Sequence, residues 1–246
     1  MDHMIYLAMS AARQMMNGQA AAAHNLANAN TTGFKADYAA YRAMPLFGEG
    51  YASRVFALEE RPGIDFSSGA LDATGNELDI ALTGEGFIAV QAPDGSEAYT
   101  RAGALQLDAI GQLTTAEGYP VLGNGGPIAL PPAEKVQIGA DGTISVRPLG
   151  QAANTLAQIE RIRLVKPELS TLLKGEDGLF RTRDGTPAPI DAGVHVTSGA
   201  LERSNVNPVG EMIHMIETAR RYELAVKAMK TAEQNDAEGA RLLRLS

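Results

Sequence analysis

The sequence predicts a discontinuous, two-part architecture. We expect a mainly β central domain, and long N- and C-terminal α-helices that pair as a coiled-coil-like bundle. At both ends of the 246-residue chain, apolar residues recur every three or four positions, which is the helical period. In the middle they alternate with polar residues, as they do in strands. Turn-forming pairs such as Asp141-Gly142 separate those alternating runs.

The first helix is expected within residues 1–30. Its stripe follows the heptad spacing of helices that associate along a seam, and all of its members except Gln19 are apolar. The stripe consists of Ile5, Met9, Ala12, Met16, Gln19, Ala23 and Leu26. Residues 31–66 have a mixed pattern interrupted by proline and glycine, which predicts a connector.

The central domain is expected at residues 67–203. The run from Glu77 to Leu82 alternates apolar and polar residues, and in the run from Arg161 to Val165 the apolar Ile162 and Leu164 should point inward. Residues 136–146 predict a hairpin that turns at Asp141-Gly142. Short strands at such spacing are typical of antiparallel domains.

The last helix is expected within residues 204–246. Asn207 is a good N-cap, and Pro208 suits the first helical position. A second stripe with a mean step near that of a supercoil continues through the helix. It consists of Met212, Ile216, Ala219, Tyr222, Val226, Met229, Ala232, Asp236, Ala240 and Leu243.

The composition excludes several classes of protein. The net charge of −8 argues against a binder of nucleic-acid phosphates, which needs excess lysine and arginine. Without cysteine the chain has no disulfide, thiolate metal site or cysteine nucleophile. No apolar run is long enough to cross a membrane, and the first residues do not read as a cleaved signal peptide.

No pattern of reactive residues predicts catalysis, a cofactor or a metal site. His214 and Glu217 lie one helical turn apart, but this spacing is common and belongs to no metal motif. The glycines between Gly123 and Gly126 lead neither into a helix nor to a phosphate-binding lysine. Four aspartates fall in turns, where they are expected to support the backbone: Asp94, Asp141, Asp177 and Asp184.

The segment HNLANANTTGFK, from His24 to Lys35, is unusually rich in residues that compete with a helical backbone. We interpret Asn25 and Asn28 as polar groups on a seam that fix the register between subunits. Asn30, Thr31 and Thr32 should cap the helix and turn the chain, Gly33 permits the turn, and Phe34 anchors the start of the connector. Simple helix termination also explains residues 30–33, but it explains Asn25 less well.

These motifs resemble those of the axial proteins of the bacterial flagellum, which form its rod and hook. HNLANANTTGFK resembles the signature after the first helix, although His24 stands where the family usually has asparagine. LERSNVNPVGEMIHMIETARRYELAVKAMKTAEQN resembles the C-terminal helix. TGNELDIALTGEGFIAV, DGSEAYTRAGALQLDAIGQLTTAEGYPVLG and IGADGTISV resemble the central domain of the rod and hook subfamily. The opening residues, the PVLGNGGPI run and the length look most like a subunit of the proximal rod.

The resemblance implies a structural subunit of the basal-body rod in the periplasm, with no catalysis and no cofactor. Such proteins pass through the flagellar type III export apparatus without a cleaved signal. They polymerise with themselves and with proximal and distal rod subunits into a shaft that transmits torque, and they neither bind nucleic acid nor enter membranes.

The resemblance also assigns the assembly surface to the two ends of the chain. On the first helix it comprises Ile5, Met9, Ala12, Met16, Ala23, Asn25, Leu26 and Asn28, followed by the motif Asn30, Thr31, Thr32, Gly33, Phe34 and Lys35. On the last helix it comprises Asn205, Asn207, Met212, Ile216, Ala219, Tyr222, Val226, Met229 and Leu243. Two alternatives stay open: a distal-rod or hook subunit, and a secreted cell-wall hydrolase with paired carboxylates in its β domain.

Overall fold

The computed structural model of the chain describes residues 4–38, 41–45, 55–59, 63–148, 150 and 156–243. The chain divides into two compact units, each assembled from segments that are distant in the sequence. Unit 1 comprises residues 1–29, 36–65 and 206–246, and unit 2 comprises residues 30–35 and 66–205. The segment 31–66, expected as a connector, is therefore divided between the two units.

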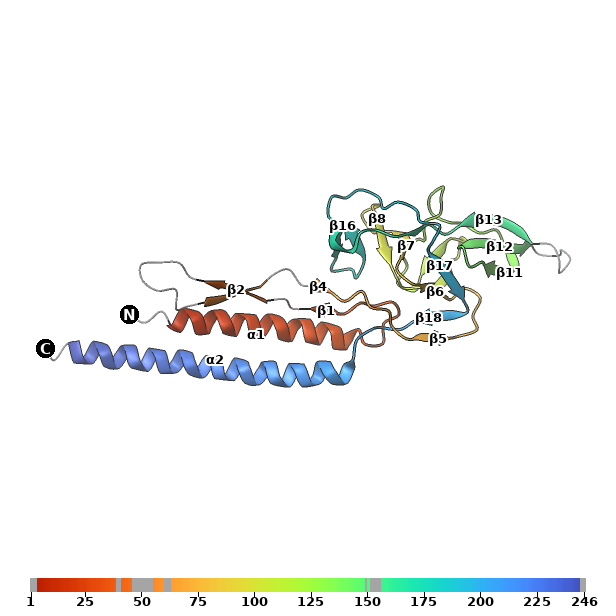
Figure 1. Ribbon diagram of the computed structural model, residues 1–246. Helices are drawn as coiled ribbons and strands as arrows, with labels where there is room; N and C mark the ends of the chain where they lie inside the picture. Colours follow the sequence, from red (N-terminus) through yellow and green to blue (C-terminus); the bar gives the residue numbers. More distant parts are fainter. Residues whose placement is uncertain are drawn as a thin grey trace. The chain divides into compact units, whose positions relative to one another are not determined.

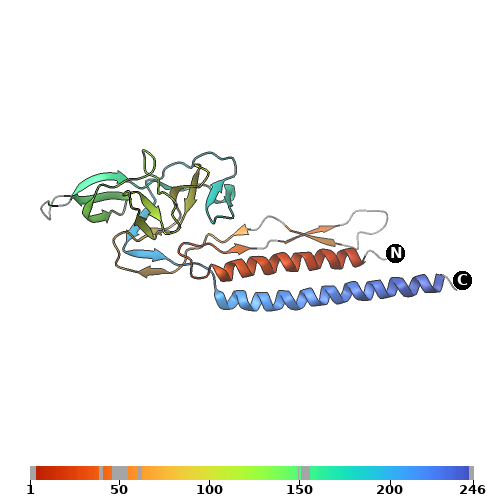
Figure 2. The same ribbon diagram turned by 180° about the vertical axis from the view of Figure 1, so that it is seen from behind.

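Unit 1 contains the two long helices. Helix α1 (Met4–Ala27) and helix α2 (Pro208–Leu243) lie side by side and run antiparallel, as Figures 1 and 2 show from opposite sides. The same unit holds two antiparallel strand pairs, of which β1 and β3 contact α1. They are β1 (Asp37–Tyr38) with β4 (Gly63–Ile64), and β2 (Tyr41–Pro45) with β3 (Val55–Glu59).

Helix α2 begins as the sequence predicts. The side-chain oxygen of Asn207 accepts a hydrogen bond of 3.2 Å from the backbone N–H of Gly210. Pro208 is the first residue of the helix, where its missing N–H costs no intrahelical bond. Asn207 is therefore the N-cap, because its side chain satisfies one of the backbone donors that a helix start leaves unpaired.

The prediction that the terminal helices pair as a coiled-coil-like bundle is wrong. The described part of the chain has only two α-helices, and strands pack with them in the same unit. A knobs-into-holes seam would bury its stripe, yet Met9, Met16 and Ile216 are 56%, 57% and 56% exposed. Heptad spacing shows which residues share a face of a helix, but not which face is covered.

Unit 2 is built from antiparallel strands. Its largest sheet has the order β14 (Leu164–Val165), β7 (Phe87–Gln91), β8 (Glu97–Thr100), β16 (Phe180–Thr182) and β15 (Leu172–Lys174), with a 3₁₀ turn at Leu169–Thr171 before β15. A three-stranded sheet has the order β11 (Ala133–Ile138), β12 (Thr143–Pro148) and β13 (Ala157–Arg161). Three strand pairs complete the unit: β5 (Leu71–Ala73) with β18 (Ala200–Glu202), β6 (Ile80–Thr83) with β17 (His195–Ser198), and β9 (Leu105–Leu107) with β10 (Leu113–Thr115).

The core of unit 2 contains apolar residues from both alternating runs, but burial along Glu77–Leu82 does not alternate as predicted, because Asp79 and Ala81 are buried as well. Ile80, Leu82, Ile162 and Leu164 are all at most 3% exposed and belong to one apolar cluster. The predicted hairpin joins β11 to β12, with Val136 opposite Val146. Its turn needs Gly142, whose φ of 83° lies in the left-handed region that glycine adopts without strain.

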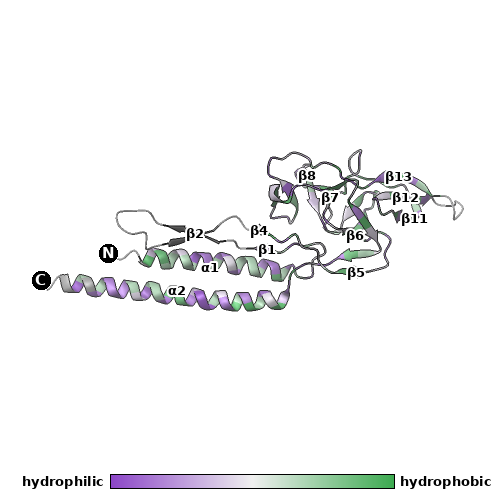
Figure 3. Cartoon of the chain, in the orientation of Figure 1, coloured by the Kyte–Doolittle hydropathy of each residue, from purple (hydrophilic) through white to green (hydrophobic). Residues whose placement is uncertain are grey.

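Apolar and polar residues alternate along both helices, as Figure 3 shows in green and purple. Within the described residues, no helix is both long enough and apolar enough to span a bilayer. Both helices expose apolar and charged side chains along their lengths.

Candidate assembly interface

Helix α1 exposes a stripe of residues separated by three or four positions. The stripe consists of Tyr6, Met9, Arg13, Met16, Ala20, Ala23 and Ala27. Among the residues that the sequence assigns to assembly, Met9, Met16 and Ala23 are exposed, Ile5, Leu26 and Asn28 are half-buried, and Ala12 and Asn25 are buried. The assignment is therefore corrected for Ala12 and Asn25, because unit 1 already covers their side chains.

Helix α2 exposes large apolar side chains along its first half. Of the predicted residues Met212, Ile216 and Tyr222 are exposed, and Ala219, Val226 and Met229 are half-buried. Leu243 ends the helix, but its side chain lies outside those that the structure describes. The periodic analysis missed Val209, Ile213 and Leu224, which are 65%, 54% and 66% exposed.

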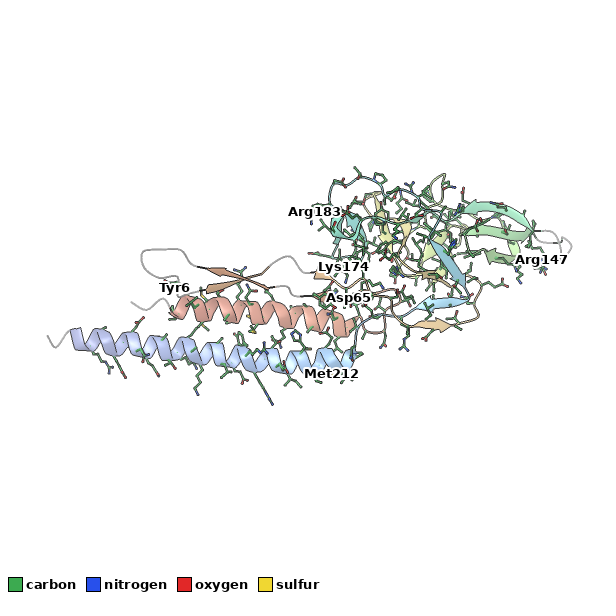
Figure 4. The ribbon with its side chains drawn as sticks, in the orientation of Figure 1. Tyr6, Asp65, Arg147, Lys174, Arg183 and Met212 are labelled. Carbon is green, nitrogen blue, oxygen red and sulfur yellow. The ribbon has the colours of Figure 1, made fainter. Side chains whose placement is uncertain are left out.

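The exposed apolar residues of the two helices make the clearest candidate for a binding surface. Figure 4 labels Tyr6 near the start of α1 and Met212 near the start of α2. Single exposed apolar side chains are ordinary, but a periodic row on each of two neighbouring helices is typical of a surface that another chain covers. Full burial of one Met or Ile side chain there would contribute about 1.5–3 kcal/mol.

Asn25 joins three elements of unit 1 rather than facing another subunit. Its amide nitrogen donates to the backbone oxygen of Asp37 in β1 and to Oε1 of Glu211 in α2, both at 2.9 Å. Its amide oxygen accepts from the backbone N–H of Asp37 at 2.8 Å. The neighbouring His24 contacts the Asp37 carboxylate through Nδ1 at 2.7 Å. The side chain of Asn25 thus forms these hydrogen bonds within a single subunit, without a neighbouring one.

Asn28 forms hydrogen bonds at the C-terminal end of α1. Both its backbone N–H and its side-chain amide donate to the carbonyl oxygen of His24, at 3.2 and 3.0 Å. Asn30 is exposed, and Thr31 and Thr32 are half-buried. The carbonyl of Thr31 accepts from the N–H of Phe34 at 3.3 Å, so Thr31 takes part in the turn that comes after the helix.

Gly33 occupies a position that only glycine can fill without strain. Its φ is 70°, and a Cβ atom built on it would lie 2.3 Å from the backbone carbon of Arg101. Its N–H donates to the carbonyl oxygen of Glu202 at 2.8 Å. The predicted permissive backbone is confirmed, and the structure adds a close approach between two segments of unit 2.

Phe34 and Lys35 are buried in unit 2. The ammonium of Lys174, labelled in Figure 4, lies 3.7 Å from the centroid of the Phe34 ring and donates to the carbonyl of Lys35 at 2.8 Å. The carbonyl of Phe34 accepts from the N–H of Asn205 at 3.4 Å. Asn205 also donates through its side chain to the carbonyl of Ser67 at 3.1 Å, whereas Asn207 is exposed. Phe34 therefore anchors the motif as expected.

Lys35 belongs to a buried ionic cluster with Arg101 and Glu202. Its Nζ lies 2.7 Å from Oε1 of Glu202, and Nε of Arg101 donates to Oε2 of the same carboxylate at 2.8 Å. The side chains of Lys35 and Glu202 are 0% exposed and that of Arg101 is 3% exposed. Burial would raise the pKa of the Glu202 carboxyl, but the hydrogen bond from Lys35 and the charge of Arg101 together hold it below its usual value.

Sequence reasoning did not single out Arg101 and Glu202, the other two members of the buried cluster. Neither stands in a recognisable motif of charged residues, and Glu202 is separated from Lys35 by 167 residues and from Arg101 by 101. The one available signal was the lysine at the end of the motif, because a buried lysine requires an acidic partner.

The carboxylates in turns support the backbone, as predicted. Asp94 accepts from the N–H and hydroxyl of Ser96, and Asp141 does the same with Thr143. Asp177 forms an ion pair with Arg181 at 2.6 Å. His214 lies 4.0 Å from Glu211, and the described residues contain no group of three side chains that could hold a metal ion. This arrangement gives no support to a pair of acids across a cleft.

Three family models match the chain. Residues 5–35 match "Flagella basal body rod protein", residues 81–146 match "Flagellar hook protein FlgE/F/G D1 domain", and residues 197–242 match "Flagellar basal body rod FlgEFG protein C-terminal". The first and third contain the exposed helical stripes, and the first also contains Lys35.

Three similar proteins carry the name flagellar basal-body rod protein FlgF. The chain is 45% identical to the protein of Escherichia coli and 44% identical to that of Salmonella typhimurium, in each case over 252 aligned residues. It is 37% identical to that of Caulobacter vibrioides over 256 aligned residues. In all three comparisons, 100% of both chains is covered.

Proposed function

The chain belongs to the FlgF family of flagellar basal-body rod proteins, and we propose that it polymerises through the exposed stripes of its two terminal helices. It is a structural subunit of the flagellar basal-body rod. The observation that carries the proposal is the exposure of Met9 and Met16 on α1 and of Ile213 and Ile216 on α2, each at least 54%.

The stripes suit a polymer because they lie on one chain and differ from each other. Association between different surfaces of identical subunits continues from copy to copy and builds helical assemblies. Each new contact buries apolar surface on both partners, so the free energy of association accumulates along the shaft. A shaft held in this way resists torque through many contacts rather than through one strong contact.

The subunit is located in the flagellar basal body and assembles with other rod proteins. Within that location we place it in the proximal rod, in the periplasm, as part of the shaft that transmits motor torque. Family membership supports the further proposal that it reaches the periplasm through the flagellar type III export apparatus without a cleaved signal.

Neither alternative is favoured. A distal-rod or hook subunit fits less well, because relatives named FlgF match the chain over its full length. The family is structural, which argues against a cell-wall hydrolase, and the turn aspartates bind their own backbone segments.

The absence of cysteine allows a sharp test of the helical interface. Ala22 and Ala23 are neighbours on α1, but Ala22 is 2% exposed whereas Ala23 is exposed. In the purified subunit, the thiol of Ala23→Cys should react with a maleimide reagent and that of Ala22→Cys should not. In isolated basal bodies, the Ala23→Cys thiol should become protected because a neighbouring subunit covers it.

Ala22→Cys and Ala23→Cys differ in the exposure of adjacent positions on the same helix, so Ala22→Cys is the control for thiol reactivity. Equal reactivity of Ala23→Cys in the purified subunit and in basal bodies would show that this stripe stays in solvent after assembly. A second site on α2, Ile216→Cys, tests the other stripe in the same way. Motility of both strains would verify that the altered subunits enter the rod.

A further inference from the structure

Several segments of unit 2 meet at the carboxylate of Glu202. One oxygen accepts from Lys35 at 2.7 Å and from the backbone N–H of Gly69 at 2.9 Å, and the other accepts from Arg101 at 2.8 Å. The remaining donors of this cluster are also used. Lys35 donates to the carbonyl of Ser67 at 2.6 Å, and Arg101 donates to those of Gly84 and Gly86 at 3.1 and 2.9 Å.

The cluster lies where the chain enters and leaves unit 2. The first passage, by which the chain enters the unit, is residues 30–35. The second passage, by which the chain leaves it, ends at Asn205. These two passages are bonded directly to each other, since Gly33 donates to the carbonyl of Glu202 and Asn205 donates to the carbonyl of Phe34. The ion pair between Lys35 and Glu202 therefore joins the two passages. Arg101, which directly follows β8, adds a third segment to the same carboxylate.

An incomplete cluster would be costly because all three side chains are withdrawn from water. If only the second passage were docked, one oxygen of Glu202 and the carbonyl of Ser67 would lose their lysine. If only the first were docked, Lys35 and Arg101 would both lose the carboxylate of Glu202. Removing one partner of a buried ion pair is far more destabilising than the pair itself is stabilising.

We propose that Lys35, Arg101 and Glu202 form a clamp that makes a rigid β core in unit 2 conditional on docking both passages, the first at residues 30–35 and the second ending at Asn205. A chain with one passage undocked leaves buried polar atoms of the cluster without hydrogen-bond partners, so its core opens more readily. The complete chain has both passages fixed, only a few residues from the end of α1 and from the start of α2. This role rests on the proposed function: the clamp restricts assembly to subunits in which both passages of unit 2 are docked.

Hydrogen exchange of the full-length Lys35→Met variant, followed by mass spectrometry, tests the clamp. Methionine preserves the length of the side chain but removes its charge and its donors. Exchange should accelerate roughly a hundredfold at Gly33 and Gly69, and by a similar factor at Ile80 and Ala89 in the core strands. Acceleration confined to Gly33 and Gly69, with wild-type exchange at Ile80 and Ala89, would overturn the proposal.

Lys135→Met is the matched control. Lys135 also forms an ion pair, with Glu77 at 2.8 Å, but the two side chains are 38% and 47% exposed. Its loss should leave the exchange of both regions unchanged. If Lys135→Met also opened the core, the effect would come from losing any ion pair and the proposal would fail.

A double variant with reversed charges tests whether Arg101 is a member of the clamp. In the double variant Lys35→Glu and Glu202→Lys, the first pair is restored with reversed charges, but Arg101 then faces a lysine. The backbone amides of unit 2 should therefore exchange at least as fast in this double variant as in Lys35→Met. Recovery of wild-type exchange would show an isolated pair and overturn the three-membered clamp.

These measurements separate the clamp from the proposed function. Exchange rates are read on the purified subunit, whereas thiol protection of Ala23→Cys is read on basal bodies. A failure of the helical interface would leave the exchange result unchanged, and a failure of the clamp would leave the thiol result unchanged.

Discussion

The side-chain amide of Asn25, in the last turns of α1, donates a hydrogen bond of 2.9 Å to Oε1 of Glu211, in the first turn of α2. The two residues are separated by 186 positions in the sequence. The same amide also makes two bonds with the backbone of Asp37. A single 2%-exposed side chain thus fixes one end of the antiparallel helix pair and the start of the adjacent strand.

Replacing Asn25 with alanine should destabilise unit 1. The substitution leaves the N–H and the carbonyl of Asp37 without their side-chain partners, and a buried unsatisfied group costs about 1–3 kcal/mol. Urea denaturation followed by helical circular dichroism measures the loss. Asn28→Ala, which removes a solvent-exposed bond to the backbone of His24, should cost less than Asn25→Ala. An effect of Asn25→Ala no larger than that of the control would contradict the role of the network.

Gly33→Ala should be more destabilising than Gly75→Ala. The two glycines have nearly the same φ, 70° and 72°, so each substitution carries the left-handed strain of about 1–2 kcal/mol. Only at Gly33 would the new Cβ meet backbone, 2.3 Å from the carbon of Arg101, whereas nothing lies within 4 Å at Gly75. The denaturation midpoints of unit 2 in the two variants give the comparison. Equal losses of stability would show that the segments around Gly33 and Arg101 can move apart without cost.

The stability of unit 2 should depend on pH through Glu202. Its folded pKa is lowered, so the carboxylate contributes stability above its unfolded pKa of about 4.3, and that contribution is lost as pH falls through the folded value. The difference in unfolding free energy between the wild type and Glu202→Gln should therefore be largest near neutral pH and shrink below about pH 4. A difference that stayed constant down to about pH 2 would exclude ionisation as the source.

Ile216→Asp should abolish incorporation into rods while the subunit still folds. The Ile216 side chain is 56% exposed, so the monomer should lose less than about 1 kcal/mol, but a charge at an apolar interface must be desolvated on assembly. Swimming and co-purification of rod neighbours give the readout. Ile110→Asp, at an 82%-exposed position of unit 2, is the matched control and should swim normally. Normal swimming of Ile216→Asp would count against the helical interface.

Elements governed by local rules were predictable from the sequence. The Asn207 cap and the glycine turn of the hairpin depend on neighbours within a few residues. The start of α2 at Pro208 was likewise expected from the residue itself.

The candidate site was predictable only in part. Heptad spacing assigned Met9, Met16 and Ile216 to an assembly surface, and all three are exposed in the structure. The coiled-coil pairing of the two helices that the same spacing predicted is wrong, because a seam within the chain would bury them. Asn25 was assigned to a subunit interface because the sequence does not show that Asp37 and Glu211 approach it.

By itself, the sequence determined the helical ends, the strands and turns of the middle, and the family to which the chain belongs, because these depend on periodicity and short motifs. The tertiary structure alone decided which faces of α1 and α2 remain in solvent, and that Lys35, Arg101 and Glu202 meet in one buried cluster. The physical reason is that burial and ion pairing depend on which distant segments approach each other, and a linear pattern carries no information on that distance.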